Sequence, residues 1–190
     1  MSQGENNEKI SEPKSTWKEL VSMLIYVGVV LLLTFLVVRY VGQRTQVSGS
    51  SMYPTLHDND NLIVDKLTYR FTDPERYDII VFPYQYKEET YYIKRIIGLP
   101  GETVQIKDGV IYINGKILEE EYGREAMQRS GLAAEEIQLG EDEYFVLGDN
   151  RNASSDSREP SVGNIKRENI IGRAFIRIWP FNRFGILKHQ

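Results

Sequence analysis

The sequence contains no cysteine and only two histidines, His57 and His189. Without a thiol the chain has no disulfide framework, no cysteine nucleophile and no cysteine-ligated zinc or iron–sulfur centre. Two histidines do not favour a multi-histidine metal site, so we expect no metal. The lack of cysteine suits an exported domain that folds without redox help, although a cytosolic protein can equally lack it.

Excess positive charge is also missing. The chain has 190 residues and a formal net charge of -4, and it carries no RNA- or DNA-binding signature, so no nucleic-acid partner is expected. An N-terminal tail and an apolar run take up about forty residues. The roughly 150 that remain suit one domain with its own core.

Only one long apolar run is present, from Leu20 to Val38. At about 1.5 Å per residue it just spans a hydrocarbon core of about 30 Å. We predict a disordered polar tail over residues 1–18, a transmembrane anchor over 19–40 and a folded domain over 41–190. A cleaved secretory signal is the alternative, but its apolar region would be shorter and followed by small residues. Three lysines precede the run and two arginines follow it, which favours a cytoplasmic N-terminus.

After the anchor the pattern is of short β-type runs separated by turns. Strands are predicted over 61–66, 78–82, 90–97, 103–107, 110–113, 144–147 and 170–179. Asp108-Gly109 and Asn114-Gly115 are tight-turn pairs, so 103–113 is predicted to be a hairpin. The acidic stretch from Glu119 to Gln138 could hold a short helix near Ala126. We therefore predict a mostly β, antiparallel domain.

The first candidate site is the segment Ser48-Gly49-Ser50-Ser51-Met52-Tyr53-Pro54-Thr55-Leu56. Its first four residues alone would suit a flexible stalk after an anchor. The apolar residues and the proline that follow are not typical of a linker. A nucleophilic serine needs an exposed hydroxyl and a backbone N–H aimed at the developing oxyanion, and a Gly-Ser-Ser turn can supply both.

The second candidate is Lys94, which lies within Tyr91-Tyr92-Ile93-Lys94-Arg95-Ile96-Ile97. A serine hydroxyl needs a general base, and a neutral lysine can serve as one. An ordinary lysine has a pKa of about 10.4, so burial or a nearby cation must lower it. A solvent-facing lysine is the alternative, but both faces of this strand are apolar, which favours burial. Arg95 would also help to keep Lys94 neutral.

The third segment is Gly148-Asp149-Asn150-Arg151-Asn152-Ala153-Ser154-Ser155-Asp156-Ser157-Arg158. By itself it would be a polar surface loop. Its acidic and basic residues can pair beside small hydroxyl groups, so it could orient a catalytic lysine.

Together the three segments resemble the conserved boxes of the bacterial type I signal peptidases, in order and in spacing. Ser51 to Leu56, Lys94 to Glu102 and Gly148 to Arg158 carry the resemblance, together with the anchor upstream. Arg76 to Phe82 resembles a further box, with Tyr77 where the family more often has glycine. The single anchor and short intervening region resemble the small enzymes of Gram-positive bacteria.

The resemblance implies an antiparallel β-sheet catalytic domain with a smaller β-hairpin-rich insertion. It implies that Ser51 is the nucleophile and Lys94 the general base, with Ser154 hydrogen-bonded to the Lys94 amine. Asp156, with Arg158 or Arg95, would hold the loop in place, and Asp149 would be structural.

It further implies an extended substrate that binds beside Val47 and Tyr92-Ile93, while Met52, Leu56 and Ile93 form small apolar pockets. Gly49, also an expected substrate-binding residue, stands where some family members place an oxyanion-stabilising serine, so the Ser51 N–H is the expected donor. The implied reaction removes signal peptides from exported preproteins at the surface of the cell membrane, with small residues at positions -3 and -1. It requires no cofactor, and the catalytic domain would lie outside the cytoplasm, in contact with membrane lipid.

Three other readings are open. A self-cleaving repressor uses a similar serine–lysine pair, but it carries a DNA-binding domain where this chain has an apolar run. The endoplasmic-reticulum signal peptidase subunit has histidine where this chain has Lys94. A membrane-tethered β domain that serves only as a scaffold would not explain a lysine within an apolar strand.

Overall fold

The computed structural model describes residues 16–40, 42–123 and 125–187, and of residues 38–40 only the backbone. The chain divides into two compact units, one ending at Arg39 and the other starting at Tyr40. We describe each unit by itself.

The first unit contains a single helix, α1, from Thr16 to Tyr40. The stretch from Thr16 to Val37 is long and apolar enough to cross a membrane, and none of it is buried. The predicted N-terminal apolar helix is therefore confirmed. The helix begins before the predicted anchor, so residues 16–18 are not part of a disordered tail. Glu19 lies in the first turn, where a carboxylate stabilises the exposed N–H groups of a helix start. The rest of the predicted tail lies outside the described residues.

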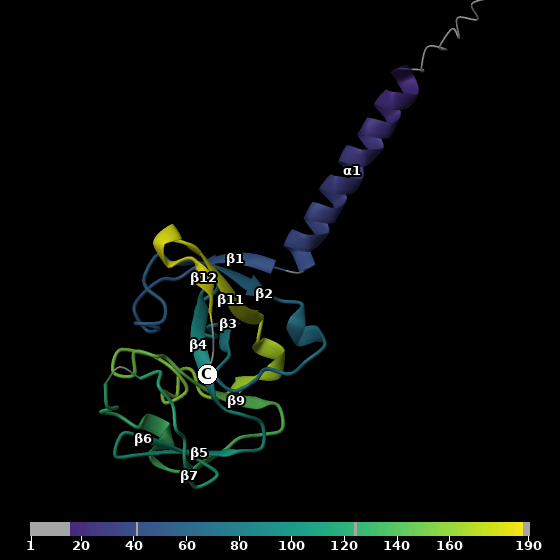
Figure 1. The fold of residues 1–190 in the computed structure, drawn as a ribbon. Helices are drawn as coiled ribbons and strands as arrows, with labels where there is room; N and C mark the ends of the chain where they lie inside the picture. The colour runs from purple at the N-terminus through teal and green to yellow at the C-terminus, as the bar shows by residue number, and fades with distance from the viewer. Residues whose placement is uncertain (1–15, 41, 124, 188–190) are drawn as a thin grey trace, which may run out of the picture. The chain divides into compact units, whose positions relative to one another are not determined.

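The second unit is built on a large antiparallel sheet with the order β1-β2-β11-β3-β4-β9-β10, in which β12 also pairs with β11 (Figure 1). Its strands are β1 (Gly42–Gln46), β2 (Asn61–Asp65), β3 (Ile79–Pro83), β4 (Tyr91–Gly98), β9 (Glu143–Leu147), β10 (Ile165–Lys166), β11 (Gly172–Trp179) and β12 (Gly185–Ile186). The predicted antiparallel β domain is confirmed. The prediction missed β1, β10 and β12, because two of them are only two residues long and β1 reads Gly-Gln-Arg-Thr-Gln, without apolar alternation.

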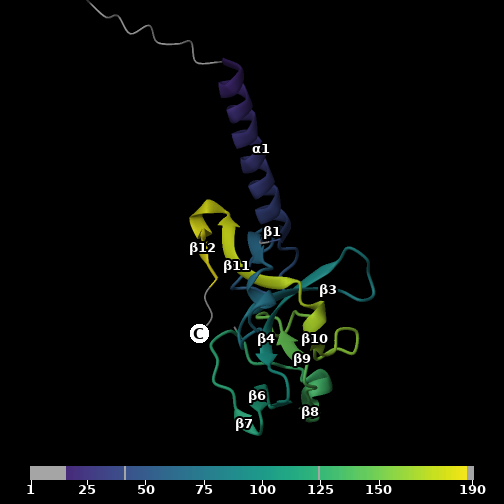
Figure 2. The same ribbon diagram turned by 90° about the vertical axis from the view of Figure 1, so that its right-hand side faces the viewer.

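A smaller antiparallel sheet has the order β7-β6-β5-β8. It consists of β5 (Thr103–Lys107), β6 (Val110–Ile113), β7 (Lys116–Ile117) and β8 (Ile137–Gln138), and Figure 2 shows β6 and β7 at the end of the unit opposite β12. The predicted hairpin is confirmed, since Asp108 and Gly109 both have positive φ, as a type I′ turn requires. The described residues around Ala126 form no helix. A 3-10 turn, η2, stands later, at Gly131–Ala134.

Strand β4 is the central element of the site, because it lies between β3 and β9 in the large sheet. It pairs with β3 from Tyr91 to Arg95 but with β9 only from Arg95 to Gly98. Within the described strands, the first half of β4 therefore keeps one edge without a partner strand. From Ile93 onward every residue of β4 is buried, so the two charged residues at its centre, Lys94 and Arg95, are both inside the protein.

Candidate active site

We name the loop of residues 48–56, which carries the predicted nucleophile Ser51, the nucleophile loop. Buried apolar side chains hold it after Ser51, and hydrogen bonds of backbone N–H groups hold it before Ser51. Met52 and Leu56 are 1% and 0% exposed and belong to one core cluster. Val47 N donates to Asp60 O at 2.8 Å, and Gly49 N donates to the Asp58 carboxylate at 2.8 Å. Gly49 has a φ of +91°, a conformation that glycine adopts without steric cost. These contacts fix the turn that presents Ser51.

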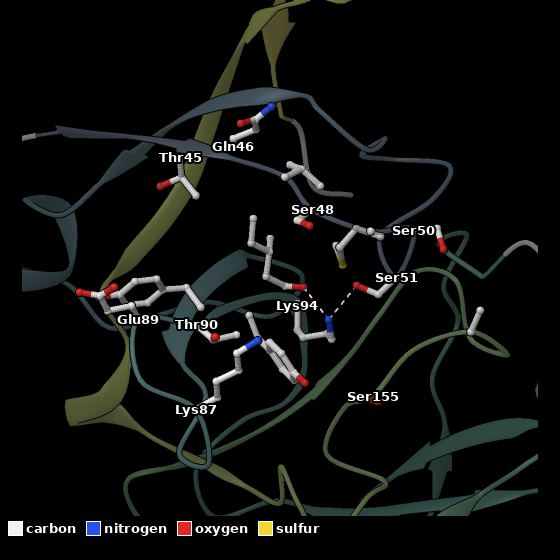
Figure 3. A pocket seen from close by; sticks show the side chains of 17 residues that line it. Thr45, Gln46, Ser48, Ser50, Ser51, Lys87, Glu89, Thr90, Lys94 and Ser155 are labelled. Carbon is white, nitrogen blue, oxygen red and sulfur yellow. Dashed lines mark hydrogen bonds between the residues drawn. The ribbon is translucent and has the colours of Figure 1, made fainter.

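Lys94 lies directly against this turn, as Figure 3 shows. Its Nζ is 2.8 Å from Ser51 Oγ and donates to Ile93 O at 3.0 Å. The side chain is almost fully buried, and burial lowers the pKa of Lys94 to about 8, although the carboxylates of Asp156 and Asp149 act in the opposite direction. Because burial is the main cause, the amine has a substantial neutral fraction near neutral pH. It can then accept the Ser51 proton.

Arg95 points to a different set of partners and is fully paired. Its guanidinium donates to both carboxylate oxygens of Asp149, at 2.8 and 2.7 Å, with both side chains 0% exposed. It also donates to Tyr77 O at 2.8 Å, and it stacks on the Tyr122 ring, 3.5 Å from the ring centre. The ion pair of Arg95 is thus with Asp149, not with Asp156. Burial, rather than Arg95, is the leading cause of the lowered Lys94 pKa.

Residues 148–158, the site loop, pack against the nucleophile loop at Ser51. Asp156 accepts from Gly148 N at 3.1 Å and from two nitrogens of Arg158, each at 2.8 Å. The loop reaches Ser51 directly, since Asn150 N donates to Ser51 O at 2.9 Å. The partner of Asp156 is therefore Arg158, the first of the two predicted alternatives.

Ser154 does not make its predicted hydrogen bond. It is 8% exposed, and its Oγ has no hydrogen-bond partner among the described residues. It nevertheless lies at the site: a Cβ on Gly148 would overlap both Ser154 Oγ and the carbonyl oxygen of Ser51. Gly148 therefore permits a close approach of the site loop to the nucleophile loop, and it leaves a buried hydroxyl beside Ser51.

A cavity of about 650 Å³ opens at Ser51 and Lys94 (Figure 3). Five of the predicted substrate-binding residues line it together with Ser51 and Lys94: Val47, Gly49, Met52, Tyr92 and Ile93. Leu56, the sixth, is not in the lining and lies in the core. Leu56 N donates to the carbonyl of Met52, one turn earlier. Leu56 therefore supports the loop by packing in the core rather than by lining the cavity.

The cavity extends further than predicted. Its lining includes Thr45 and Gln46 of β1, and Lys87, Glu89 and Thr90 before β4. Residues 45 and 46 immediately precede the predicted Val47, but they were not predicted to bind substrate because β1 lacks an alternating apolar pattern. The others are polar residues of a connecting loop, and no motif marked them.

Comparison with known proteins identifies the family. The family model described as "Signal peptidase, peptidase S26" matches residues 17–179. Probable signal peptidase I-2 of Synechocystis sp. is 39% identical over 96% of this chain and 82% of its own length. Signal peptidase I of Leptolyngbya laminosa is 41% identical, over 93% and 88%.

Signal peptidase I T of Bacillus subtilis is 35% identical over 93% of both chains. This match supports the predicted resemblance to the small Gram-positive type, while the cyanobacterial relatives show that the likeness extends beyond it. A family model that covers most of the chain, and relatives similar over nearly their whole length, agree with the serine and lysine found together at the cavity. The chain belongs to the signal peptidase family, peptidase S26, whose members are signal peptidase I enzymes that remove signal peptides from preproteins.

Proposed function

We propose that the enzyme cuts preproteins with Ser51 as nucleophile and Lys94 as general base. The observation that carries this proposal is the 2.8 Å separation of Lys94 Nζ from Ser51 Oγ, at a lysine that is 4% exposed. Neutral Lys94 takes the hydroxyl proton as Ser51 Oγ bonds to the scissile carbonyl carbon. The ammonium then gives that proton to the leaving amine as the peptide C–N bond breaks. Lys94 next deprotonates a water that hydrolyses the acyl-enzyme.

The developing oxyanion needs a donor close to the nucleophile. Gly49 offers no hydroxyl, and its N–H is already bonded to Asp58. We assign the Ser51 N–H as the principal donor. The geometry of the nucleophile loop supports this. The carbonyl of Ser51 itself accepts from Asn150 N, which fixes the peptide plane that follows Ser51.

The substrate would bind as an added β-strand. The first half of β4 has an edge without a partner strand among the described residues, and this edge and Val47 line the cavity. Backbone hydrogen bonds would hold an extended peptide there, while side chains enter pockets on alternate sides. Met52 and Ile93 border the cavity close to the dyad, so small residues at -3 and -1 would fit where larger ones would clash.

Helix α1 would place this reaction at a membrane. We propose that it anchors the enzyme with the N-terminus in the cytoplasm and the catalytic domain outside, next to membrane lipid. The anchor would confine enzyme and preprotein to one surface and raise their effective concentration. The support is the apolar helix, which is long enough to cross a membrane, and the three lysines before the apolar run, against two arginines after it.

The test is cleavage of a preprotein with Ala at -3 and -1 by detergent-solubilised enzyme. Wild type should cut after the -1 Ala, and folded Ser51→Ala and Lys94→Ala should lose activity by about 10² to 10⁴-fold. Lys116→Ala, at an exposed lysine of β7, is the matched control and should retain activity. Activity that persists in Lys94→Ala would reject the assigned base. Failure of folded wild type to cut several preproteins in several lipids would favour the scaffold reading.

A further inference from the structure

The described residues of the acidic stretch between β7 and β8 form no regular structure apart from η2, yet two of them are buried in a core cluster. Met127 is 9% exposed and Ala133 is 0% exposed, and both belong to the core cluster of the smaller sheet. We name residues 119–134 the strap; residue 124 lies outside the described residues. A segment with buried anchors and little secondary structure must satisfy its backbone elsewhere, and several of its partners lie in the site loop.

The central contact is an ion pair between Glu120 of the strap and Arg151 of the site loop. Both Nη atoms of Arg151 donate to the Glu120 carboxylate, Nη2 at 2.7 Å, and the two side chains are only 2% and 10% exposed. Arg151 Nε meanwhile donates to Gly148 O at 3.1 Å, and Arg151 O accepts from Arg158 at 2.6 Å. One residue thus connects the strap to both ends of the site loop.

Two further residues of the site loop reach the strap. Asn152 donates to Ala126 O and accepts from Gln128 N, each at 3.0 Å. Arg158 donates to Arg129 O at 3.1 Å, and its own carbonyl accepts from Leu132 N at 2.8 Å. These bonds explain why the described residues near Ala126 form no helix, because their backbone N–H and C=O groups are hydrogen-bonded to side chains of the site loop.

The strap also contacts the strand that carries the base. Tyr122 lies against the guanidinium of Arg95, and Glu119 O accepts from the Tyr77 hydroxyl at 3.0 Å. Arg95 is next to Lys94 in sequence, and its carboxylate partner, Asp149, belongs to the site loop. The strap therefore touches both elements that surround the dyad, but it is absent from the cavity lining.

We propose that the strap is a positioning element of the active site, in which Glu120, through Arg151, fixes the site loop against Ser51 and Lys94. This proposal rests on the proposed function, since it assigns the reaction to this dyad. A charge pair that is largely shielded from water holds its geometry better than an exposed pair, which solvent screens. Positioning matters because a displacement of about 1 Å at a reacting group can cost a factor of about 10² in rate.

The experiment compares full-length Glu120→Gln and Asn152→Ala with wild type in detergent. Glu120→Gln keeps the shape of the side chain and removes its charge, and Asn152→Ala removes two bonds to the strap from the other side. Glu136→Gln, at an exposed carboxylate of the same acidic stretch, is the matched control. Both variants should lower kcat by roughly tenfold, with KM changed little, because neither Glu120 nor Asn152 lines the cavity. The control should match wild type.

A second readout separates positioning from a loss of stability. Around the Lys94 amine lie Ser51, the Tyr92 ring, and the carboxylates of Asp149 and Asp156. A loosened site loop admits water, and since burial is the main cause of the lowered Lys94 pKa, that pKa should rise in both variants. NMR titration of ¹³Cε-labelled lysine, with Lys94 assigned by its absence in Lys94→Met, measures it directly.

Folded variants with wild-type kcat and an unchanged Lys94 titration would overturn the strap proposal, even if their melting temperatures fell. If wild type cuts no preprotein, the proposed function fails. The Lys94 titration in the same samples still decides whether the strap positions the dyad.

Discussion

Lys94 and Arg95 are adjacent in β4 and buried to nearly the same extent, but among the described residues only Arg95 has a carboxylate partner that balances its charge. On the Arg95 side, a guanidinium is matched by both oxygens of Asp149, a backbone carbonyl and an aromatic face. On the Lys94 side, no described carboxylate forms an ion pair with the amine, which contacts a hydroxyl and a carbonyl. A buried cation with full compensation remains charged and serves as framework. A buried amine without an ion-pair partner becomes titratable near neutral pH, and it can do proton transfer.

Breaking the ion pair of Arg95 with Asp149, the compensated side of the comparison, should produce the largest loss of stability. Asp149→Asn leaves the Arg95 charge buried without its counter-charge, and removal of one partner from a buried pair costs about 3–5 kcal/mol. Urea unfolding of the protein should show this decrease in the free energy of unfolding. Asp142→Asn, at an exposed carboxylate, is a control of the same chemistry. A loss below about 1 kcal/mol, the usual value for an exposed pair, would mean that the Arg95 side is not compensated as described.

Lys94, the uncompensated side, should instead make the free energy of unfolding depend on pH. The Lys94 pKa is about 8 in the folded protein and about 10.4 in an unfolded chain. Between these values the unfolded chain holds a proton that the folded protein has released. Stability should therefore rise from pH 8 to 10.4 by about 3 kcal/mol, and Lys94 should contribute no slope below pH 8. The difference between wild type and Lys94→Met isolates this contribution from that of tyrosines, which titrate in the same range.

The same ionisation should control turnover. As pH falls below about 8, the neutral fraction of Lys94 drops, so kcat should fall about tenfold per pH unit. A flat profile from pH 6 to 10 would contradict Lys94 as base. Equal pH slopes in wild-type and Lys94→Met unfolding would contradict the lowered pKa itself.

How much of this the sequence could show depends on where each residue's partners lie. The hairpin at Asp108-Gly109 was predictable because two adjacent residues determine the turn. The contact between Lys94 and Ser51 was predictable because the apolar neighbours of Lys94 indicate burial and the family resemblance pairs it with Ser51. The Asp149 partner of Arg95 was not, since both Asp149 and Asp156 lie in one loop and only the fold separates them. The strap was beyond reach for the same reason: its backbone is satisfied by Asn152 and Arg158, which follow it in the chain.

Tyr77 allows the finest test of the compensated side, since its carbonyl accepts from Arg95. Its φ is +73°, a left-handed conformation that costs a residue with a Cβ about 1–2 kcal/mol relative to glycine. The Tyr77 hydroxyl bond to Glu119 O and its ring contact with Tyr122 offset this cost. Tyr77→Ala keeps the strain and loses the contacts, whereas Tyr77→Gly loses both. Urea unfolding should therefore find Tyr77→Ala less stable than Tyr77→Gly by about 1 kcal/mol. The opposite order would show that the backbone at residue 77 is not left-handed in solution. The hydrogen bond from Arg95 to the Tyr77 carbonyl would then have a different geometry.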